Sequence, residues 1–449
     1  MMLNIVPKDS FQNGVHPPEH KDETSHLAIR RFAFAPQLIV PLSQHLGKPA
    51  IAVVREGQEV VRGQTIGEPD GFMSVAMHAP ASGVVKRIAL APSISGTMVP
   101  SVYLQPFPAS SQEVDDGEPC DVATATPDEI ITAIQQAGVV GLGGAAFPTH
   151  VKLKPPDGKQ LDTLIINGVE CEPYLTTDHR VMLEQSADIF MGVRYLLRVT
   201  GAAEVIIAIE ANKRDAERKL TKACPPDLPL SIRVCPVKYP QGAEKLVIKS
   251  LLGREIPSGG LPADVNAICV NVATTAEIGR LLPKGRGIQE RVITIGGPGI
   301  QRKGNYRIPI GTTVRFALKE TGAADNVSRV FLGGPMMGPA VSNLDIPITK
   351  GTSGITVFTT AETIEATGHK TVYPCIHCAR CVEACPLFLN PSYLGLLAKS
   401  EEYMQMAEEF HLMDCFECGA CSYVCPSHIP LVQYFRLAKK MVRKLNVPA

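Results

Sequence analysis

The sequence predicts a multidomain protein of the α/β and α+β classes, and three observations lead to that prediction. With 449 residues the chain is long enough for about three domains with cores of their own. Its pattern changes from short β-branched segments to alternating strands and helices, and then to short strands with glycine-rich turns. Eight of its 13 cysteines gather between Cys375 and Cys425, which predicts a metal-binding domain at the end.

The charge balance and the hydropathy pattern exclude two broad classes of protein. Lysine and arginine together number 44, as do aspartate and glutamate, so no net charge attracts nucleic acid or anionic lipid. No apolar run reaches the roughly 18 residues that a membrane-spanning helix needs, and the first residues do not resemble a secretory signal. We therefore expect a cytoplasmic protein without transmembrane segments of its own.

Residues 1–100 predict an N-terminal extension followed by a compact β module. The first 30 residues mix charges, prolines and three histidines, and we expect them to lie extended over other parts, with the histidines on the surface. Between residues 49 and 89, short β-branched segments alternate with glycine turns. EGQEVVRGQTIG and HAPASGVVKRI resemble the biotinyl and lipoyl barrel-sandwich fold, but no lysine lies between Lys48 and Lys86 to carry a cofactor. The module is therefore expected to be structural.

A linker rich in proline, serine and acid, residues 101–126, leads to the central domain, residues 127–285. There TPDEIITAIQQAG predicts an amphipathic helix with Thr126 as its N-cap. LDTLIINGVECEP and AEVIIAIEAN contain buried-strand runs with a helix between them, which predicts a parallel sheet in a Rossmann-like domain. Residues 286–350 are typical of a small β-grasp-like module, and residues 351–449 hold the cysteines.

Two motifs of the form C-x2-C-x2-C-x3-C-P follow each other at a spacing of forty residues. Their short gaps place three thiolates around one face of a cubane cluster, and in two-cluster ferredoxins the fourth thiolate binds the other cluster. The motifs therefore predict a ferredoxin-like helical domain with two [4Fe–4S] clusters and exchanged fourth ligands. The first cluster would be held by Cys375, Cys378, Cys381 and Cys425. The second would be held by Cys415, Cys418, Cys421 and Cys385.

A pair of zinc sites is the alternative reading of these motifs. Structural zinc usually shows two C-x2-C pairs rather than triplets that end in Cys-Pro. Between the motifs, residues 391–414 read as one helix that packs on the cluster domain.

A glycine-rich loop in the central domain is the second candidate site. GVVGLGGAAFPTH puts small residues where a backbone could approach a phosphate. It follows a helix rather than a strand, so it does not match the dinucleotide fingerprint, and alone it predicts only a turn. Further along lie Lys152, the segments NGVECEP and YPQGAEK, and Asn271, and this combination favours a nucleotide site.

With these segments together, the sequence resembles two related families. GLGGAAFPTHVKL, INGVECEP and YPQGAEK are similar to the GRGGAGFPTGLKW-like loop, the NADEGEP-like strand end and the YICGEET-like segment of the flavin- and NADH-binding subunit of respiratory complex I. PLSQHLGKPA, SGGLPADV, GGPMMG, PITKGTSGI and the paired cysteine motifs resemble the RnfC subunit of the Rnf-type ion-translocating electron transport complex over nearly the whole chain.

The resemblance implies that FMN binds noncovalently and that NAD(H) is the substrate. It implies a cofactor-binding set made of Gly141, Gly143, Gly144, Phe147, Lys152, Asn167, Glu170 and Asn271. It implies a catalytic set that faces the flavin and the nicotinamide, namely Glu172, Tyr239 and Glu244. This sequence departs from the family pattern at Val169, which replaces an acidic residue, and at Ala243, which replaces a glutamate.

The same resemblance implies a function, because flavin joins the two-electron chemistry of NADH to one-electron iron–sulfur clusters. We expect a peripheral subunit on the cytoplasmic side of the membrane. Its expected partners are the integral membrane subunits that move ions and, through the complex, ferredoxin or flavodoxin. Two alternatives remain. One is a cobalamin reductase of the propanediol-utilisation type, whose family usually starts close to the glycine-rich loop. The other is a non-catalytic iron–sulfur adapter whose flavin domain is inactive and whose clusters connect two partners electrically.

Overall fold

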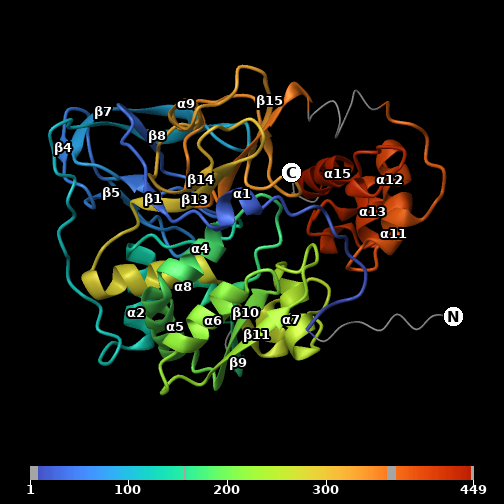
Figure 1. Ribbon diagram of the computed structural model, residues 1–449, viewed down its shortest axis with the longest axis horizontal. Coiled ribbons are helices and arrows are strands. Elements are labelled where there is room, and N and C mark those ends of the chain that lie inside the picture. The colour runs from blue at the N-terminus through green and yellow to red at the C-terminus, as the bar shows by residue number, and fades with distance from the viewer. Residues whose placement is uncertain (1–8, 156–157, 362–370, 446–449) are drawn as a thin grey trace.

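A computed structural model describes residues 9–155, 158–361 and 371–445. In Figure 1 a β module and a second mixed module lie above an α/β domain, and a helical domain lies to one side. Within the described residues, no helix is long and apolar enough to cross a membrane.

The β module contains two antiparallel sheets, of four and three strands. Its strands are β2 Leu38–Pro41, β3 Ile51–Ala52, β4 Glu59–Val60, β5 Thr65–Glu68, β6 Met77–His78, β7 Gly83–Pro92 and β8 Met98–Pro106. Inward side chains such as Val40, Ile66 and Leu104 join the same apolar cluster as Ile130 and Ile134 of the next domain. The β module is therefore packed directly on the central domain and shares its core.

The central domain is built on a four-stranded parallel sheet in the order β11-β10-β9-β12. The strands are β9 Thr163–Gly168, β10 Glu204–Glu210, β11 Leu230–Cys235 and β12 Ala267–Asn271. The helices are α2 Pro127–Gln136, α3 Thr149–Lys152, α4 Thr177–Glu184, α5 Ser186–Thr200, α6 Arg214–Ala223, α7 Glu244–Leu252 and α8 Val272–Leu281, with short 3-10 turns at Pro262–Val265 and Leu282–Lys284. The parallel sheet and the Thr126 N-cap of α2 are confirmed, and Glu129 completes a capping box there.

Helices α5 and α8 cross very closely, which fixes the start of α8. A Cβ on Gly192 of α5 would lie 1.9 Å from the Thr275 carbonyl oxygen, and a Cβ on Gly279 of α8 would lie 1.9 Å from the Asp188 carbonyl oxygen. Only glycine allows backbones to approach this closely. The crossing thereby holds the N-terminus of α8 at the edge of the parallel sheet.

The second mixed module is a six-stranded sheet in the order β1-β14-β13-β17-β15-β16, with one helix, α9 Val314–Thr321. Its strands are β1 Arg30–Arg31, β13 Glu290–Gly296, β14 Gly304–Pro309, β15 Val327–Leu332, β16 Ala340–Val341 and β17 Gly354–Thr359. Two of these strands lie outside the 286–350 range expected from sequence. β17 pairs with both β13 and β15, and β1 comes from the N-terminal segment. Sequence patterns register local strands but not which sheet a distant strand joins.

The C-terminal domain consists of short helices around the cysteine motifs. They are α11 Arg380–Glu383, α12 Pro391–Lys399, α13 Tyr403–Glu408, a 3-10 turn Leu412–Asp414, α14 Ala420–Tyr423 and α15 Leu431–Leu445. The single helix expected over residues 391–414 is wrong. The chain breaks between α12 and α13, where Glu401 has a φ of 60°. A residue in the left-handed region cannot continue a right-handed helix.

The N-terminal segment, residues 9–29, runs between the helical domain and the central domain before it reaches β1 (Figure 1). It contains one short helix, α1 Asp22–Ser25. The expected exposure of its histidines is confirmed for His16, His20 and His26. The segment nevertheless buries four side chains, those of Phe11, Val15, Lys21 and Thr24. It is therefore anchored in the fold by both apolar and polar contacts.

Candidate functional site

The first candidate site lies at the carboxyl ends of the parallel strands. β9 is the first strand of this sheet in the chain. The strands that follow it lie on both sides of it, β10 on one side and β12 on the other. In open α/β sheets ligands bind in the crevice where the strand order reverses in this way. Asn271 ends β12, and its register partner Asn167 is the last residue but one of β9, so both lie at that crevice.

The two asparagines fix the backbone around the crevice. Asn271 is the N-cap of α8, where its Oδ1 accepts hydrogen bonds from the amides of Ala273 and Thr274 at 3.0 and 3.2 Å. Its Nδ2 donates to Asp178 of α4 at 2.8 Å. Asn167 Nδ2 donates to the Gly242 carbonyl at 2.9 Å. Both side chains therefore hold neighbouring elements in place.

The glycine-rich loop, residues 141–147, lies against the start of α8. The Gly141 amide donates to the Phe147 carbonyl at 2.8 Å, and the Leu142 amide donates to Thr274 Oγ1 at 2.9 Å. A Cβ on Gly143 would lie 3.1 Å from Asn271 Nδ2. Gly143 and its next two neighbours are exposed, and in the described structure their amides have no hydrogen-bond partner. Free amides beside a helix N-terminus suit a phosphate group.

Lys152 and Glu244 face each other at the side of this crevice. The Lys152 ammonium donates to Glu244 Oε1 at 2.5 Å, and about a third of each side chain is exposed. Lys152 ends the short helix α3, and Glu244 begins α7. The two residues expected to meet phosphate and nicotinamide thus form an ion pair that a ligand can reach.

Glu170 is buried and holds a helix. Its carboxylate accepts hydrogen bonds from the Asp178 amide at 3.0 Å and the His179 amide at 3.3 Å, at the start of α4. Only 8% of its surface is exposed. Glu170 therefore positions α4, which carries the Asp178 partner of Asn271, and its oxygens do not point freely toward a flavin.

Glu172 and Tyr239, which were expected to face the flavin and the nicotinamide, both contact neighbouring modules. Glu172 accepts hydrogen bonds from the amides of Met336 at 3.2 Å and Met337 at 2.7 Å, in the GGPMMG loop. Burial raises the pKa of Glu172 to about 7, against the opposing effect of these two amides. The Tyr239 hydroxyl donates to the Cys418 carbonyl at 2.5 Å, and the tyrosine is 1% exposed.

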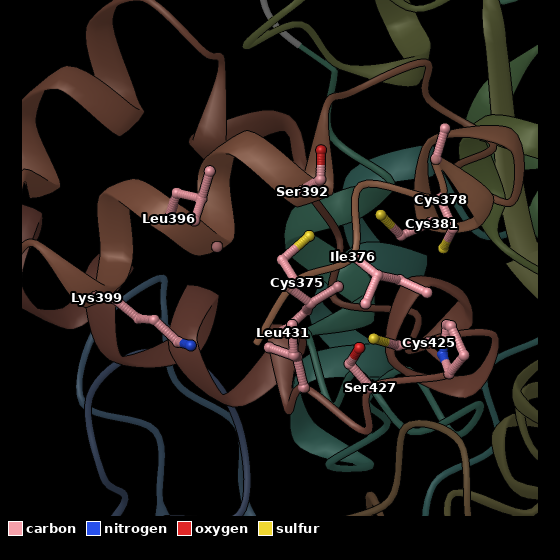
Figure 2. A pocket seen from close by; sticks show the side chains of 14 residues that line it. Cys375, Ile376, Cys378, Cys381, Ser392, Leu396, Lys399, Cys425, Ser427 and Leu431 are labelled. Carbon is pink, nitrogen blue, oxygen red and sulfur yellow. The ribbon is translucent and has the colours of Figure 1, made fainter. Parts of the chain in front are cut away.

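The second candidate site comprises two sets of cysteines. The outer set, Cys375, Cys378, Cys381 and Cys425, lines one cavity, as Figure 2 shows. The inner set is Cys385, Cys415, Cys418 and Cys421, and Cys385 lies close enough to the other three to interact with them electrostatically. Each set thus combines three cysteines of one motif with the fourth of the other.

Each set offers the four thiolates that a [4Fe–4S] cluster requires. Among the described residues, no three His, Cys, Asp or Glu side chains come close enough to share one metal ion. A four-iron cluster separates its thiolates more widely, because each thiolate binds a different iron. The two motifs also have the same backbone conformation at matching positions. His377 and Ala379 of the first motif and Glu417 and Gly419 of the second all have a positive φ.

Comparison with known proteins places this architecture. A subunit of a proton-translocating ferredoxin:NAD(+) oxidoreductase complex from Clostridium ljungdahlii is 40% identical over 96% of this chain and 93% of its own length. The chain belongs to the RnfC family. A subunit of a Na(+)-translocating ferredoxin:NAD(+) oxidoreductase complex from Acetobacterium woodii is 39% identical over 97% of this chain and 98% of its own. A subunit of an ion-translocating oxidoreductase complex from Haemophilus influenzae is 39% identical over 97% of this chain and 65% of its own.

Three family models match successive parts of this member of the RnfC family. The RnfC barrel sandwich hybrid domain matches residues 9–106, the Nuo51 FMN-binding domain matches residues 134–280, and the 4Fe-4S dicluster domain matches residues 374–429. The first covers the N-terminal segment and the β module, the second the glycine-rich loop and the parallel sheet, and the third all eight clustered cysteines. The resemblance inferred from the motifs is thereby confirmed.

Three polar residues of this RnfC family member were not predicted, the buried Lys21 and Arg291 and the half-buried Asp178. Lys21 donates to the carbonyls of Glu170, Glu172 and Leu175 at 2.6, 2.9 and 2.7 Å. Arg291 donates to the Leu142 carbonyl in the glycine-rich loop at 2.9 Å. Burial raises the pKa of Asp178, the third, to about 7. A lone arginine at the start of the apolar run RVITIG is a signal that could have indicated Arg291, because a buried strand seldom carries a charge.

Proposed function

We propose that this chain passes electrons between NAD(H) and the membrane-bound part of an ion-translocating complex. It is a peripheral subunit on the cytoplasmic side of the membrane, and it exchanges electrons with integral membrane subunits and, through them, with ferredoxin or flavodoxin. The names of two relatives, from a proton-translocating and a Na(+)-translocating ferredoxin:NAD(+) oxidoreductase complex, support this proposal.

The observation that carries the proposal is the direct packing between the crevice of the parallel sheet and the inner cysteine set. The chain that leaves β9 at Gly168 continues to Cys171, whose Sγ accepts a hydrogen bond from the Gly242 amide. Cys171, Tyr239 and Cys418 then pack in one apolar cluster. A crevice for flavin and a cluster site that share a packed boundary form a short path for electrons.

The residues of the crevice fit FMN in a Rossmann-like domain. The free amides of Gly143 and Gly144 and the ammonium of Lys152 would hold the phosphate, in a loop that Gly141 and Phe147 close through their hydrogen bond. Asn167 and Asn271 border the ring. When bound, FMN supplies the step between a two-electron hydride donor and one-electron acceptors. Glu244, which pairs with Lys152 and is partly exposed, would orient the nicotinamide.

The cysteine sets fit two [4Fe–4S] clusters, with each set of four thiolates holding one. The inner set adjoins the central domain, whereas the outer set lies near the surface, where Cys378 is exposed and Ile376 is 65% exposed. A cluster held by the inner set would therefore lie between a flavin in the crevice and a cluster held by the outer set. The β-grasp-like module supports this arrangement through its GGPMMG loop.

The proposed function is tested by anaerobic reduction of the purified, reconstituted protein with NADH. FMN should be present, NADH should bleach its visible absorbance, and the electron paramagnetic resonance (EPR) signals of reduced clusters should follow. A protein that holds both clusters but no FMN, and that NADH does not bleach, would support the non-catalytic adapter instead.

The cobalamin reductase alternative is tested by purification from membranes. The barrel sandwich module at residues 9–106 favours the Rnf assignment. An Rnf subunit should copurify with integral membrane subunits after mild detergent extraction. Recovery of the native protein without any of them, together with reduction of cobalamin by NADH, would favour the reductase.

A further inference from the structure

The inner and outer cysteine sets differ in how their backbone is held. Three of the four inner cysteines have a carbonyl that accepts a hydrogen bond from a distant side chain. Asn13 Nδ2 donates to the Cys385 carbonyl at 3.0 Å, and the Tyr239 hydroxyl donates to the Cys418 carbonyl at 2.5 Å. The Lys439 ammonium donates to the Cys415 carbonyl. Within the described residues, no side chain donates to a carbonyl of the outer set.

Two of these three donors come from outside the cluster domain, and they lie side by side. Val15 and Tyr239 pair with each other, amide to carbonyl, at 2.8 and 2.9 Å. The Gly14 amide donates to the Ala384 carbonyl at 3.2 Å. The N-terminal segment and the Tyr239 loop together therefore form one clasp, which we define as Asn13–Val15 with Tyr239. It contacts the inner set at Cys385 of the first motif and at Cys418 of the second.

The clasp places positive ends of dipoles beside the inner set. A donated N–H or O–H opposes the negative potential of a ligand carbonyl, and reduction of a cluster adds negative charge. In a buried site such dipoles are weakly screened, and Tyr239 is 1% exposed. The donors therefore favour the reduced form of a cluster held by the inner set more than that of a cluster held by the outer set.

We infer that Asn13 and Tyr239 are positioning residues that hold the inner cysteine set against the flavin domain and selectively raise the reduction potential of the cluster bound there. The inference rests on the cluster assignment in the proposed function. It assigns the N-terminal segment a role in electron transfer, and it separates the two clusters by potential although their binding motifs are the same. The cluster nearer the flavin domain is then the one whose reduction potential the clasp raises.

The first test is Tyr239→Phe, which removes one hydroxyl and keeps the ring. Anaerobic dithionite titration, followed by EPR, gives a midpoint potential for each cluster. The inner potential should shift to a more negative value, and the outer potential should stay. Tyr393→Phe is the matched control, because it removes a hydroxyl from a tyrosine of the cluster domain that is 41% exposed and donates to neither set. Repeating the titration in a Cys378→Ala background, which removes an outer ligand, identifies the inner signal.

The second test is Asn13→Ala, with the exposed neighbour Gln12→Ala as control. Asn13→Ala should shift the same signal in the same direction, and Gln12→Ala should shift neither. A purely structural clasp would lower the unfolding temperature and leave both potentials in place, which would overturn the inference. Equal shifts of both signals would overturn it too.

Failure of the inference and failure of the proposed function give different results. The titration uses dithionite and needs neither NADH nor FMN. If the inner potential shifts as expected while NADH fails to reduce the protein, the clasp stands and the NAD(H)-linked function falls. If the parent protein binds no iron and sulfide, the cluster assignment falls, and the inference falls with it.

Discussion

Glu170 and Glu172 lie two positions apart in the loop after β9, and their carboxylates bind two different neighbouring elements. Both were expected to face the flavin, because the resembling families place acidic residues there. In the structure, Glu170 holds the start of α4 and Glu172 holds the GGPMMG loop. Lys21 binds the carbonyls of both residues from the N-terminal segment. These side chains shape the crevice by fixing the backbone around it.

Glu172 should make stability depend on pH in a defined window. Burial raises its pKa in the folded chain to about 7, from an ordinary value of 4.5. Its contribution to folding is therefore complete below about pH 4.5 and is lost as the pH rises through 7, with a size on the order of 3 kcal/mol. Glu172→Gln keeps the shape and removes the titration. Between pH 5 and pH 8 the unfolding temperature of the parent should fall relative to that of the variant. A constant difference between the two would contradict this assignment.

Lys152→Ala should weaken FMN binding without loss of iron. The lost charge-assisted hydrogen bond is worth roughly 1.5 kcal/mol or more, which is about tenfold in the dissociation constant. The binding is measured by quenching of flavin fluorescence on titration into the apoprotein. Lys159→Ala serves as control, because Lys159 also forms an ion pair, with Asp264, but lies outside the crevice. Equal FMN affinity in the two variants would remove Lys152 from the phosphate site.

At the residue scale, the sequence predicted what depends on local spacing. The cysteine motifs specify their own geometry, because three ligands within one short loop must meet, and the four Cys residues of the outer set do line one cavity. The partners of Tyr239 and Lys21 lie far along the chain, at Cys418 and near Glu170. No local pattern records such contacts, and the nicotinamide role that the family pattern suggested for Tyr239 stays a prediction.

At the element scale, the N-terminal segment connects parts of the fold that the chain builds much later. It supplies β1 to the second sheet, Lys21 to the strand-end loop and Asn13 to the cluster domain. Its polar composition predicted an extended surface segment, and its path is indeed extended. Its buried contacts were not predictable, because they depend on single residues such as Phe11 and Val15 rather than on a periodic apolar face.

Gly14→Ala should loosen the N-terminal segment. Gly14 has a φ of +86°, and a Cβ there would lie 2.6 Å from the Tyr239 carbonyl oxygen. We expect a cost of about 1 to 3 kcal/mol, seen as faster hydrogen exchange at the Val15 and Tyr239 amides. Gly96→Ala is the control, since Gly96 has a similar φ of +80° and nothing within 4 Å of the added Cβ. Unchanged exchange in Gly14→Ala would show that the pairing tolerates the methyl group.

At the scale of the whole molecule, the modules depend on one another to different degrees. The β module and the central domain share one apolar cluster, whereas the cluster domain has a small core of its own. Two of the proposed cluster ligands, Cys381 and Cys421, belong to that small core. The sequence predicted the order of the modules but not this sharing of cores, because packing between modules leaves no repeat or spacing in the chain.

Removal of the clusters should therefore unfold one end of the molecule and spare the rest. Metal-dependent small domains lose their structure with their metal. After treatment with a chelator and an oxidant, hydrogen exchange should accelerate across α12 and α15 while β9, β10 and β12 stay protected, and FMN should remain bound. Loss of protection throughout the chain would mean that the central domain also depends on the clusters.

The exchanged fourth cysteines have a consequence for biosynthesis. In the proposed pairing, the outer set waits for Cys425 and the inner set needs Cys415, Cys418 and Cys421, so a nascent chain that ends before the second motif can complete neither. Delivery of iron and sulfide must then await synthesis of the second motif. A nonsense mutation between the motifs would yield a polypeptide with an intact flavin domain and no route for its electrons.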